Sequence, residues 1–205
     1  MQILLVDDHW FVHEGVGAYL EQAGLEVTHA YTGEEALERI AQERPAVVVM
    51  DVSMPGAKWD GIEACREVRS RCGAAPPVLI YTVASTVAEE PWRPYAEAVL
   101  AGAAGYVDKG ARKEELVRAI RLVAEGQPFF DPRRMQEAMV EWGRAAQREA
   151  AYRSLTRRER EVFALLQAGK TNREIAEALA IAYDTVRNHV SSILGKMGIS
   201  RRAEL

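Results

Sequence analysis

The sequence predicts an α/β domain with a parallel sheet over residues 1–125 and a small all-α domain over residues 154–205. Two observations predict this fold class. Short apolar runs alternate with helical patterns in the first part, and strand patterns are missing from the second. The length of 205 residues suits two small domains, and 48% hydrophobic with 27% charged residues is typical of a globular protein.

Five apolar runs are the expected strands of the first domain. They lie at residues 3–6, 25–30, 46–50, 77–81 and 104–107. Between the runs, apolar residues recur at helical spacing, as at Leu116, Ile120 and Val123. Strands that alternate with helices form a parallel sheet covered on both faces, and such folds bind ligands at the carboxyl ends of the strands.

Residues 126–153 are expected to form a linker that contains a helix. The segment GQPFFDPRR has two prolines and a glycine, and Asp131 followed by Pro132 is a good N-cap and first helical residue. We expect this interdomain helix to end at about Arg148.

The last part predicts three or four short helices. Thr156 with Glu159, and Thr171 with Glu174, have the spacing of capping boxes, and Gly169 is a C-cap. The following segment, YDTVRNHVSSILGKM, has an apolar stripe that consists of Val186, Val190, Ile193, Leu194 and Met197. Two short helices joined by a tight turn form a helix-turn-helix.

The face opposite this stripe carries short polar side chains with a basic residue on each flank. The polar residues are Asp184, Asn188, Ser191 and Ser192, and the flanking residues are Arg187 and Lys196. Short side chains and asparagine can reach base edges, while arginine and lysine bind phosphates or guanine. The helix therefore has a face suited to DNA.

Net charge is distributed unevenly along the chain. Residues 1–125 carry 12 Lys/Arg against 20 Asp/Glu, residues 126–153 carry 5 against 4, and residues 154–205 carry 9 against 6. The resulting balances of −8, +1 and +3 describe an acidic domain joined to a mildly basic one. Nucleic acid is a reasonable partner for the second.

Other features of the sequence restrict the class of protein to which the chain can belong. No apolar run has the length of a membrane span, so no membrane partner is expected. The start, MQILLVDD, is typical of a strand rather than of a signal peptide. Cys65 and Cys72 fit no metal spacing, and reduced thiols indicate a cytoplasmic protein.

Polar residues follow four of the expected strands. Asp7 and Asp8 come after the first, Asp51 after the third, Thr82 after the fourth and Lys109 after the fifth. The carboxyl ends of parallel strands meet at one edge, where three carboxylates call for a hard cation such as Mg²⁺. A cation, an ammonium and a hydroxyl around one carboxylate are what a phosphoryl group requires.

These residues resemble the receiver domain of bacterial two-component response regulators. The motifs VDDH, VVVMDVSMPG, YT and GYVDKG match that family's pattern in order over residues 1–125. The resemblance implies a flavodoxin-like (βα)5 fold in which a sensor histidine kinase phosphorylates Asp51. It also implies that Asp8, Asp51 and the backbone carbonyl of Ser53 bind Mg²⁺, with Asp7 assisting through water.

The same resemblance implies that Thr82 and Lys109 contact the phosphoryl group and that Tyr106 is the aromatic residue that turns inward on activation. We expect His9 and His13 to be surface residues of the first helix. The sequence departs from the family's pattern by extra residues near 57–59 and by a longer segment at 85–95.

Residues 154–205 are similar to the DNA-binding domain of LuxR/NarL-type (FixJ-like) regulators, on the segments LTRREREVFALLQAGKTNREIAEAL and TVRNHVSSILGKMGI. The similarity implies a recognition helix over about 183–197 with base contacts from Arg187, Asn188 and Ser191. The candidates for phosphate contacts are Thr185, Lys170, Lys196 and Arg158.

This part of the chain also departs from its family. Ala182 stands where an N-cap Ser or Thr is usual, and losing a cap costs about 1 kcal/mol. The sequence given ends at Leu205, inside the family's final helix, which contributes to dimerisation, so the last helix is expected to be short.

Together these features predict a transcription factor that is phosphorylated on Asp51, binds promoter DNA as a homodimer when active, and catalyses at most the slow loss of its own phosphoryl group. One alternative is a phosphohydrolase that acts through an aspartyl phosphate, although Ser53 stands where such enzymes carry a second acid. The other is an atypical receiver controlled by a partner or a ligand rather than by phosphate.

Overall fold

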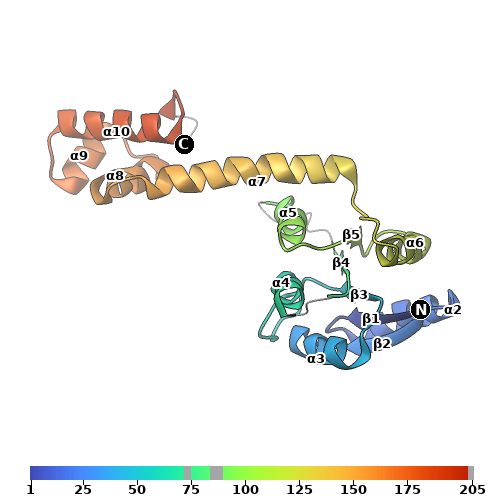
Figure 1. The fold of residues 1–205 in the computed structure, drawn as a ribbon. Helices are drawn as coiled ribbons and strands as arrows, with labels where there is room; N and C mark the ends of the chain where they lie inside the picture. The colour runs from blue at the N-terminus through green and yellow to red at the C-terminus, as the bar shows by residue number, and fades with distance from the viewer. Residues whose placement is uncertain (72–74, 84–89, 203–205) are drawn as a thin grey trace. The chain divides into compact units, whose positions relative to one another are not determined.

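The chain forms two compact units, Met1–Val140 and Glu141–Leu205. The computed structural model describes residues 1–71, 75–83 and 90–202 of them (Figure 1). The boundary lies inside helix α7 (Pro132–Arg153). The segment expected as the linker, residues 126–153, therefore contributes to both units.

A five-stranded parallel sheet forms the centre of the first unit. Its strands are β1 (Gln2–Val6), β2 (Glu26–Ala30), β3 (Val47–Met50), β4 (Val78–Thr82) and β5 (Gly105–Asp108). Every strand lies on one of the five predicted apolar runs, and the spatial order is β2-β1-β3-β4-β5. Strand β2 therefore pairs with one side of β1, and β3 pairs with the other side of β1. The predicted flavodoxin-like fold is confirmed.

Helices cover both faces of this sheet. In chain order they are α1 (Trp10–Val12), the π-helical turn η1 (His13–Gly17), α2 (Ala18–Gln22), α3 (Gly33–Glu43), α4 (Gly61–Arg71), α5 (Arg93–Leu100) and α6 (Lys113–Ala124). Leu5, Val49 and Leu79 of the sheet pack with Leu20 of α2 and Ile120 of α6 in one core cluster. Figure 1 shows α3, α4 and α5 on the other side.

The segment after α6 adds to the edge of the sheet before α7 begins. Phe129 forms a parallel bridge with Gly105: its N–H donates to the Ala104 carbonyl, and its carbonyl accepts from Tyr106 N–H, both at 2.9 Å. A Cβ on Gly105 would lie 2.7 Å from the Phe129 carbonyl oxygen, so glycine is required there. The start of the segment expected only as a linker thus attaches to the edge of the sheet through Phe129.

Helix α7 starts where the sequence predicts. Asp131 Oδ1 accepts the backbone N–H groups of Arg133 and Arg134 at 2.8 and 3.1 Å, which is N-cap geometry with Pro132 as the first helical residue. The helix continues to Arg153 rather than ending at about Arg148.

In the described part of the second unit, three helices follow α7. They are α8 (Arg157–Gln167), α9 (Asn172–Leu179) and α10 (Tyr183–Met197). Both predicted capping boxes are present, at Thr156 and at Thr171. The bounds of α10 agree with the predicted recognition helix, and Ala182 at its N-cap makes no side-chain capping bond. The helices enclose a small apolar core that includes Leu155, Val162, Ile175, Val186 and Ile193.

Some sequence predictions fall outside the described residues. These are the placement of Cys72 and of residues 85–89 within the longer segment, and most of the short final helix. Cys65, by contrast, is described, and it is a buried free thiol as expected. Among the described residues, no helix combines the length and the apolar character needed to span a membrane.

Candidate functional site

Asp7, Asp51 and Lys109 meet at the carboxyl edge of the sheet. Strands β1 and β3 pair so that Val6 lies opposite Met50, and the next residues are Asp7 and Asp51. Lys109 follows β5, and its Nζ donates to Asp7 Oδ2 at 2.5 Å and to Asp51 Oδ2 at 2.7 Å. Both carboxylates are buried. The structure therefore brings together three residues that the sequence separates by up to 102 positions.

Lys109 offsets part of the negative charge of these two carboxylates. Burial by itself would lower the pKa of Lys109, but hydrogen bonds to Asp51 and Asp7 outweigh that effect and raise the pKa. The lysine is therefore charged at neutral pH. Asp51 Oδ1 also accepts the Val52 N–H at 2.7 Å, which orients the carboxylate. An ammonium already held at this edge can stabilise negative charge on a group that arrives beside it.

Asp8 and His9 extend this acidic cluster toward solvent. One ligand atom from each of Asp7, Asp8, His9 and Asp51 lies within 4.8 Å of the others. Within the described part of the chain, the buried atom Asp8 Oδ1 accepts no hydrogen bond, although His9 Nδ1 lies 2.7 Å away at ion-pair distance. Carboxylate oxygens are the ligands that Mg²⁺ prefers. The donor set therefore fits a magnesium ion.

Thr82 and Tyr106 lie on one face of the sheet. Tyr106 pairs with Ile80, and Thr82 is two residues further along β4, so their side chains point the same way. Both are buried. Ser53 lies in the exposed part of the loop after β3. The residues expected to switch thus share a buried face beside the acidic cluster.

The extra residues near 57–59 pack between helices. The ring of Trp59 lies below two cations, with Lys58 Nζ and the Arg71 guanidinium 4.7 and 5.2 Å from the ring centroid.

At the start of α4, Gly61 lies so close to Asp51 that a Cβ would be 1.8 Å from the Asp51 carbonyl oxygen. Only glycine allows α4 to start this close to the end of β3.

The expectation for His13 is wrong, because its side chain is buried and 6% exposed. Its Nε2 lies 2.7 Å from the Asp7 carbonyl oxygen, and its Nδ1 lies 2.9 Å from Nδ1 of His29. A carbonyl only accepts, so His13 donates from Nε2, and the tautomers of the two rings decide which Nδ1 donates to the other. This pair supports the backbone of Asp7. His9 is exposed as expected, although it contacts Asp7 and Asp8.

Helix α10 exposes most of the predicted polar face. Thr185, Arg187, Asn188 and Ser191 are all exposed. Arg187 is 68% exposed, and its one ion pair with the described residues is a long contact to Asp184, at 3.8 Å. The apolar stripe faces the core, where Val186 and Ile193 have no exposed surface. This face is free to meet a ligand surface in the described structure.

Two residues predicted for that polar face or its flank are exposed but also bind a carboxylate within the unit. Ser192 Oγ donates to Glu159 Oε1 at 2.6 Å, and Lys196 Nζ donates to Glu159 Oε2 at 2.7 Å. Glu159 is buried, and the bonds from Lys196, Ser192 and Thr156 hold its pKa well below its usual value. This buried carboxylate, missed as a site of interest in the sequence, fastens α10 to α8.

The remaining basic candidates also make contacts within the unit. Arg158 donates to Glu161 at 2.6 Å and to the Leu179 carbonyl at 2.9 Å. Lys170 Nζ lies 3.4 Å from Glu174, a surface contact that leaves half of each side chain exposed. Arg158 is therefore held by protein partners, whereas Lys170 is available to an anion.

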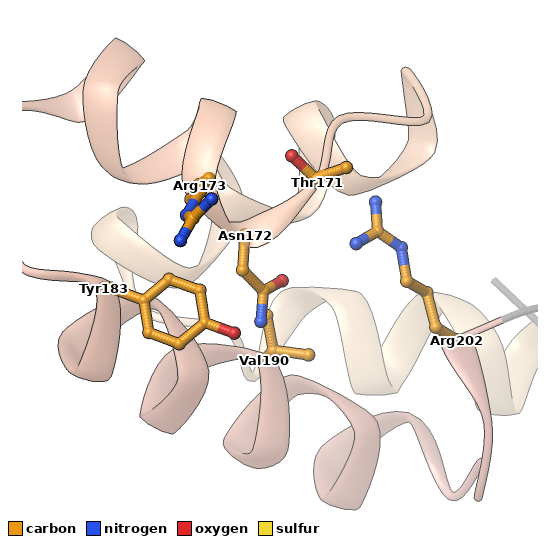
Figure 2. Close-up of a pocket in the computed structure, with 6 residues that line it drawn as sticks. All are labelled: Thr171, Asn172, Arg173, Tyr183, Val190 and Arg202. Atoms are coloured by element: carbon orange, nitrogen blue, oxygen red, sulfur yellow. The ribbon is translucent and has the colours of Figure 1, made fainter.

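A hollow between the start of α9 and α10 brings in basic residues that the sequence analysis did not select. It is lined by Thr171, Asn172, Arg173, Tyr183, Val190 and Arg202. Figure 2 shows Arg173 and Arg202 at its two ends with Asn172 between them. Both guanidinium groups lie near the positive end of α9. Arg173 could have been selected from the sequence, because it is a basic residue in the first turn of the helix that Thr171 caps.

The two units define a class of protein in which a receiver domain controls a DNA-binding domain. The family model for the response regulator receiver domain matches residues 3–121, and that for bacterial regulatory proteins of the luxR family matches residues 153–205. The chain belongs to the LuxR/NarL family of two-component response regulators.

Characterised relatives and solved structures agree with this assignment. The chain is 34% identical to the DNA-binding transcriptional activator DevR/DosR of Mycobacterium tuberculosis and 33% identical to the transcriptional regulatory protein LiaR of Bacillus subtilis, over 100% of this chain and 91% and 94% of theirs. The response regulator ChrA of a heme-sensing two-component system is 30% identical, with a TM-score of 0.57 over 99% of this chain and 92% of that one. These relatives are regulators, which sets the phosphohydrolase alternative aside.

Proposed function

We propose that a sensor histidine kinase phosphorylates Asp51 and that this modification controls promoter binding by a homodimer through helix α10. The proposal places the protein in the cytoplasm, with the chromosome. It rests above all on one observation: Lys109 Nζ lies 2.7 Å from Asp51 Oδ2 and 2.5 Å from Asp7 Oδ2, at the same edge as Asp8.

In the proposed transfer, a carboxylate oxygen of Asp51 forms a bond to phosphorus as the bond from phosphorus to the kinase histidine nitrogen breaks. Asp8, Asp51 and the Ser53 carbonyl, with Asp7 assisting through water, would hold a Mg²⁺ ion, which would supply positive charge to neutralise the phosphoryl oxygens. Lys109 leaves the Asp51 oxygen for a phosphoryl oxygen. The same arrangement exposes the acyl phosphate to slow hydrolysis, the one catalytic step that we assign to the chain itself.

The buried hydroxyl of Thr82 is the donor that we assign to a second phosphoryl oxygen. Thr82 and Tyr106 share a face of the sheet, so a shift of Thr82 toward the phosphoryl group changes the space available to the Tyr106 ring. This is the route by which we propose that the state of Asp51 reaches the surface of the domain.

For DNA, we propose that the exposed face of α10 enters the major groove. Arg187, Asn188 and Ser191 would read base edges, and Thr185 would contact a phosphate. Lys170 would bind a flanking phosphate, together with Arg173 from the hollow in Figure 2. Lys196 and Arg158 have protein partners, so we assign them a smaller share of phosphate binding.

The phosphorylation step is tested with acetyl phosphate and MgCl₂ on a phosphate-affinity gel. Wild type is expected to give a retarded band, and Asp51→Asn, which keeps the shape of the side chain, is expected to give none. Asp60→Asn is a matched control, because Asp60 is an exposed carboxylate that caps the start of α4. Absence of the band from wild type would favour the atypical-receiver alternative.

DNA binding is tested with duplexes selected from a random pool by phosphorylated wild type. Arg187→Ala and Asn188→Ala are expected to lose sequence discrimination, by about 1–3 kcal/mol at the contacted base. Glu177→Ala, an exposed change on α9, is the control. Equal discrimination by all four proteins would show that the recognition face is assigned wrongly.

A further inference from the structure

Arg134, in the first turn of α7, lies over two tyrosine rings of the receiver domain that are in contact at an interplanar angle of 41°. Its guanidinium carbon is 5.3 Å from the ring centroid of Tyr95 and 5.6 Å from that of Tyr106. The two rings are 4.7 Å apart, and both are nearly buried, at 3% and 6% exposed. Tyr95 comes from α5 and Tyr106 from β5, so one residue of the linker helix joins two elements of the receiver.

The contact is of the cation–π type rather than an ion pair. Burial raises the pKa of Tyr106 to about 12, against the smaller opposing effect of Arg134. The phenol is therefore neutral at physiological pH, and the guanidinium is attracted by the ring face. Such an attraction depends on the position of the ring, and it is lost when the ring moves away.

Neighbouring residues of the linker hold the same place. Tyr95 Oη donates to the Asp131 carbonyl at 3.2 Å, and Phe130 packs edge-on against the Tyr95 ring with centroids 5.9 Å apart. Tyr106 N–H donates to the Phe129 carbonyl at 2.9 Å. All these residues belong to the first compact unit. The start of the linker is thus docked on the pair Tyr95–Tyr106 through both backbone and side-chain contacts.

We infer that Arg134 couples the inward position of Tyr106 to the docking of the start of helix α7 on the receiver. The inference rests on the proposed function, in which the state of Asp51 biases Tyr106. A ring that stays inward keeps the surface on which Arg134 lies, and a docked Arg134 opposes outward rotation of the ring. Because such coupling is reciprocal, phosphorylation strengthens the docking, and the docking favours the phosphorylated state.

The inference is tested on the full chain with beryllium trifluoride and Mg²⁺ as a mimic of the phosphoryl group. The matched pair of variants is Arg134→Gln and Arg133→Gln, since Arg133 is exposed and its side chain makes no contact like that of Arg134 among the described residues. The first measurement is amide hydrogen exchange over residues 129–138. Wild type and Arg133→Gln are expected to gain protection when the mimic binds, and Arg134→Gln is expected to lose most of that gain.

The second measurement is the affinity for the mimic, which a merely structural role would not change. Arg134→Gln is expected to bind it about two- to fivefold more weakly, the size of one partly exposed cation–π contact. Arg134→Lys, which keeps the charge, is expected to recover part of the affinity, whereas Arg133→Gln is expected to match wild type.

The two measurements together can refute the proposed coupling in three ways. Equal affinity and equal gain of protection in Arg134→Gln and Arg133→Gln would refute the coupling while leaving the proposed function intact. Faster exchange in Arg134→Gln with unchanged affinity would also refute it, because that result describes a structural contact alone. If wild type neither binds the mimic nor accepts phosphate on Asp51, the proposed function fails, and the coupling fails with it.

Discussion

Glu159→Gln is a substitution whose cost the contacts of the second unit define well. Glutamine keeps the volume and can still complete the capping box with Thr156, but it removes the charge that faces Lys196 and Ser192. Hydrogen bonds to a charged group contribute about 1.5–3 kcal/mol each. Lys196 is 33% exposed, so its ammonium can turn to water and recover part of the loss. We expect the free energy of unfolding of this unit to fall by about 2–3 kcal/mol.

The same carboxylate makes the stability of this unit depend on pH. Because folding lowers the pKa of Glu159 below its usual 4.5, its ionised form stabilises the fold above that pH, and the contribution is lost progressively as the pH falls below it. The glutamine variant has no such group. The difference in stability between wild type and Glu159→Gln is therefore expected to be largest at neutral pH and to shrink as the pH falls from about 5 toward 3.

Amide hydrogen exchange of the full chain measures this locally, over helices α8 and α10. The control is Glu161→Gln on the same helix, because that side chain is 37% exposed and, among the described residues, forms ion pairs with Arg157 and Arg158 alone. It is expected to exchange as wild type does. Equal exchange in Glu159→Gln and Glu161→Gln at pH 7, or a difference between wild type and Glu159→Gln that does not change with pH, would refute the reasoning.

Three further changes have definite expected outcomes. Gly61→Ala places a Cβ 1.8 Å from the Asp51 carbonyl oxygen, so its melting temperature is expected to fall sharply, whereas Gly143→Ala, with open space around it, is expected to be neutral or stabilising by about 0.5–1 kcal/mol. Lys109→Ala leaves two buried carboxylates without their cation, so thermal stability is expected to become strongly dependent on MgCl₂, as a melting series would show. Ala182→Ser supplies the missing N-cap of α10 and is expected to stabilise the second unit by about 1 kcal/mol in urea unfolding.

The acidic cluster was predictable because it depends on strand ends alone. Asp7, Asp51, Thr82 and Lys109 each follow an apolar run, and parallel strands bring their carboxyl ends to one edge whatever the details of packing. Capping residues such as Thr156 were predictable for a similar reason, since their partners lie three residues away. Local patterns with one strong topological rule were sufficient for this part.

Contacts between elements distant in sequence were beyond the sequence patterns. His13 occupies a position that helical periodicity does not distinguish from the surface, and its burial depends on His29 of a different element. Arg134 looks like a solvated residue of an exposed helix, and its place over Tyr95 and Tyr106 depends on the bridge that Phe129 makes with the sheet edge. Tertiary packing determines these contacts, so the local periodicity of the sequence does not show them.

Helix α10 gives an example of a contact that the sequence pattern does not reveal. Ser191 and Ser192 are consecutive polar residues about 100° apart around the helix axis, so the periodicity places both on one polar face. In the structure both serines are exposed, but the hydroxyl of Ser192 also donates to Glu159 at 2.6 Å. The contact partner of Ser192 is therefore a carboxylate on α8, which the periodicity of α10 does not reveal. Because that carboxylate also accepts from Lys196, we expect substitutions of Ser192 or Lys196 to lower the stability of the unit.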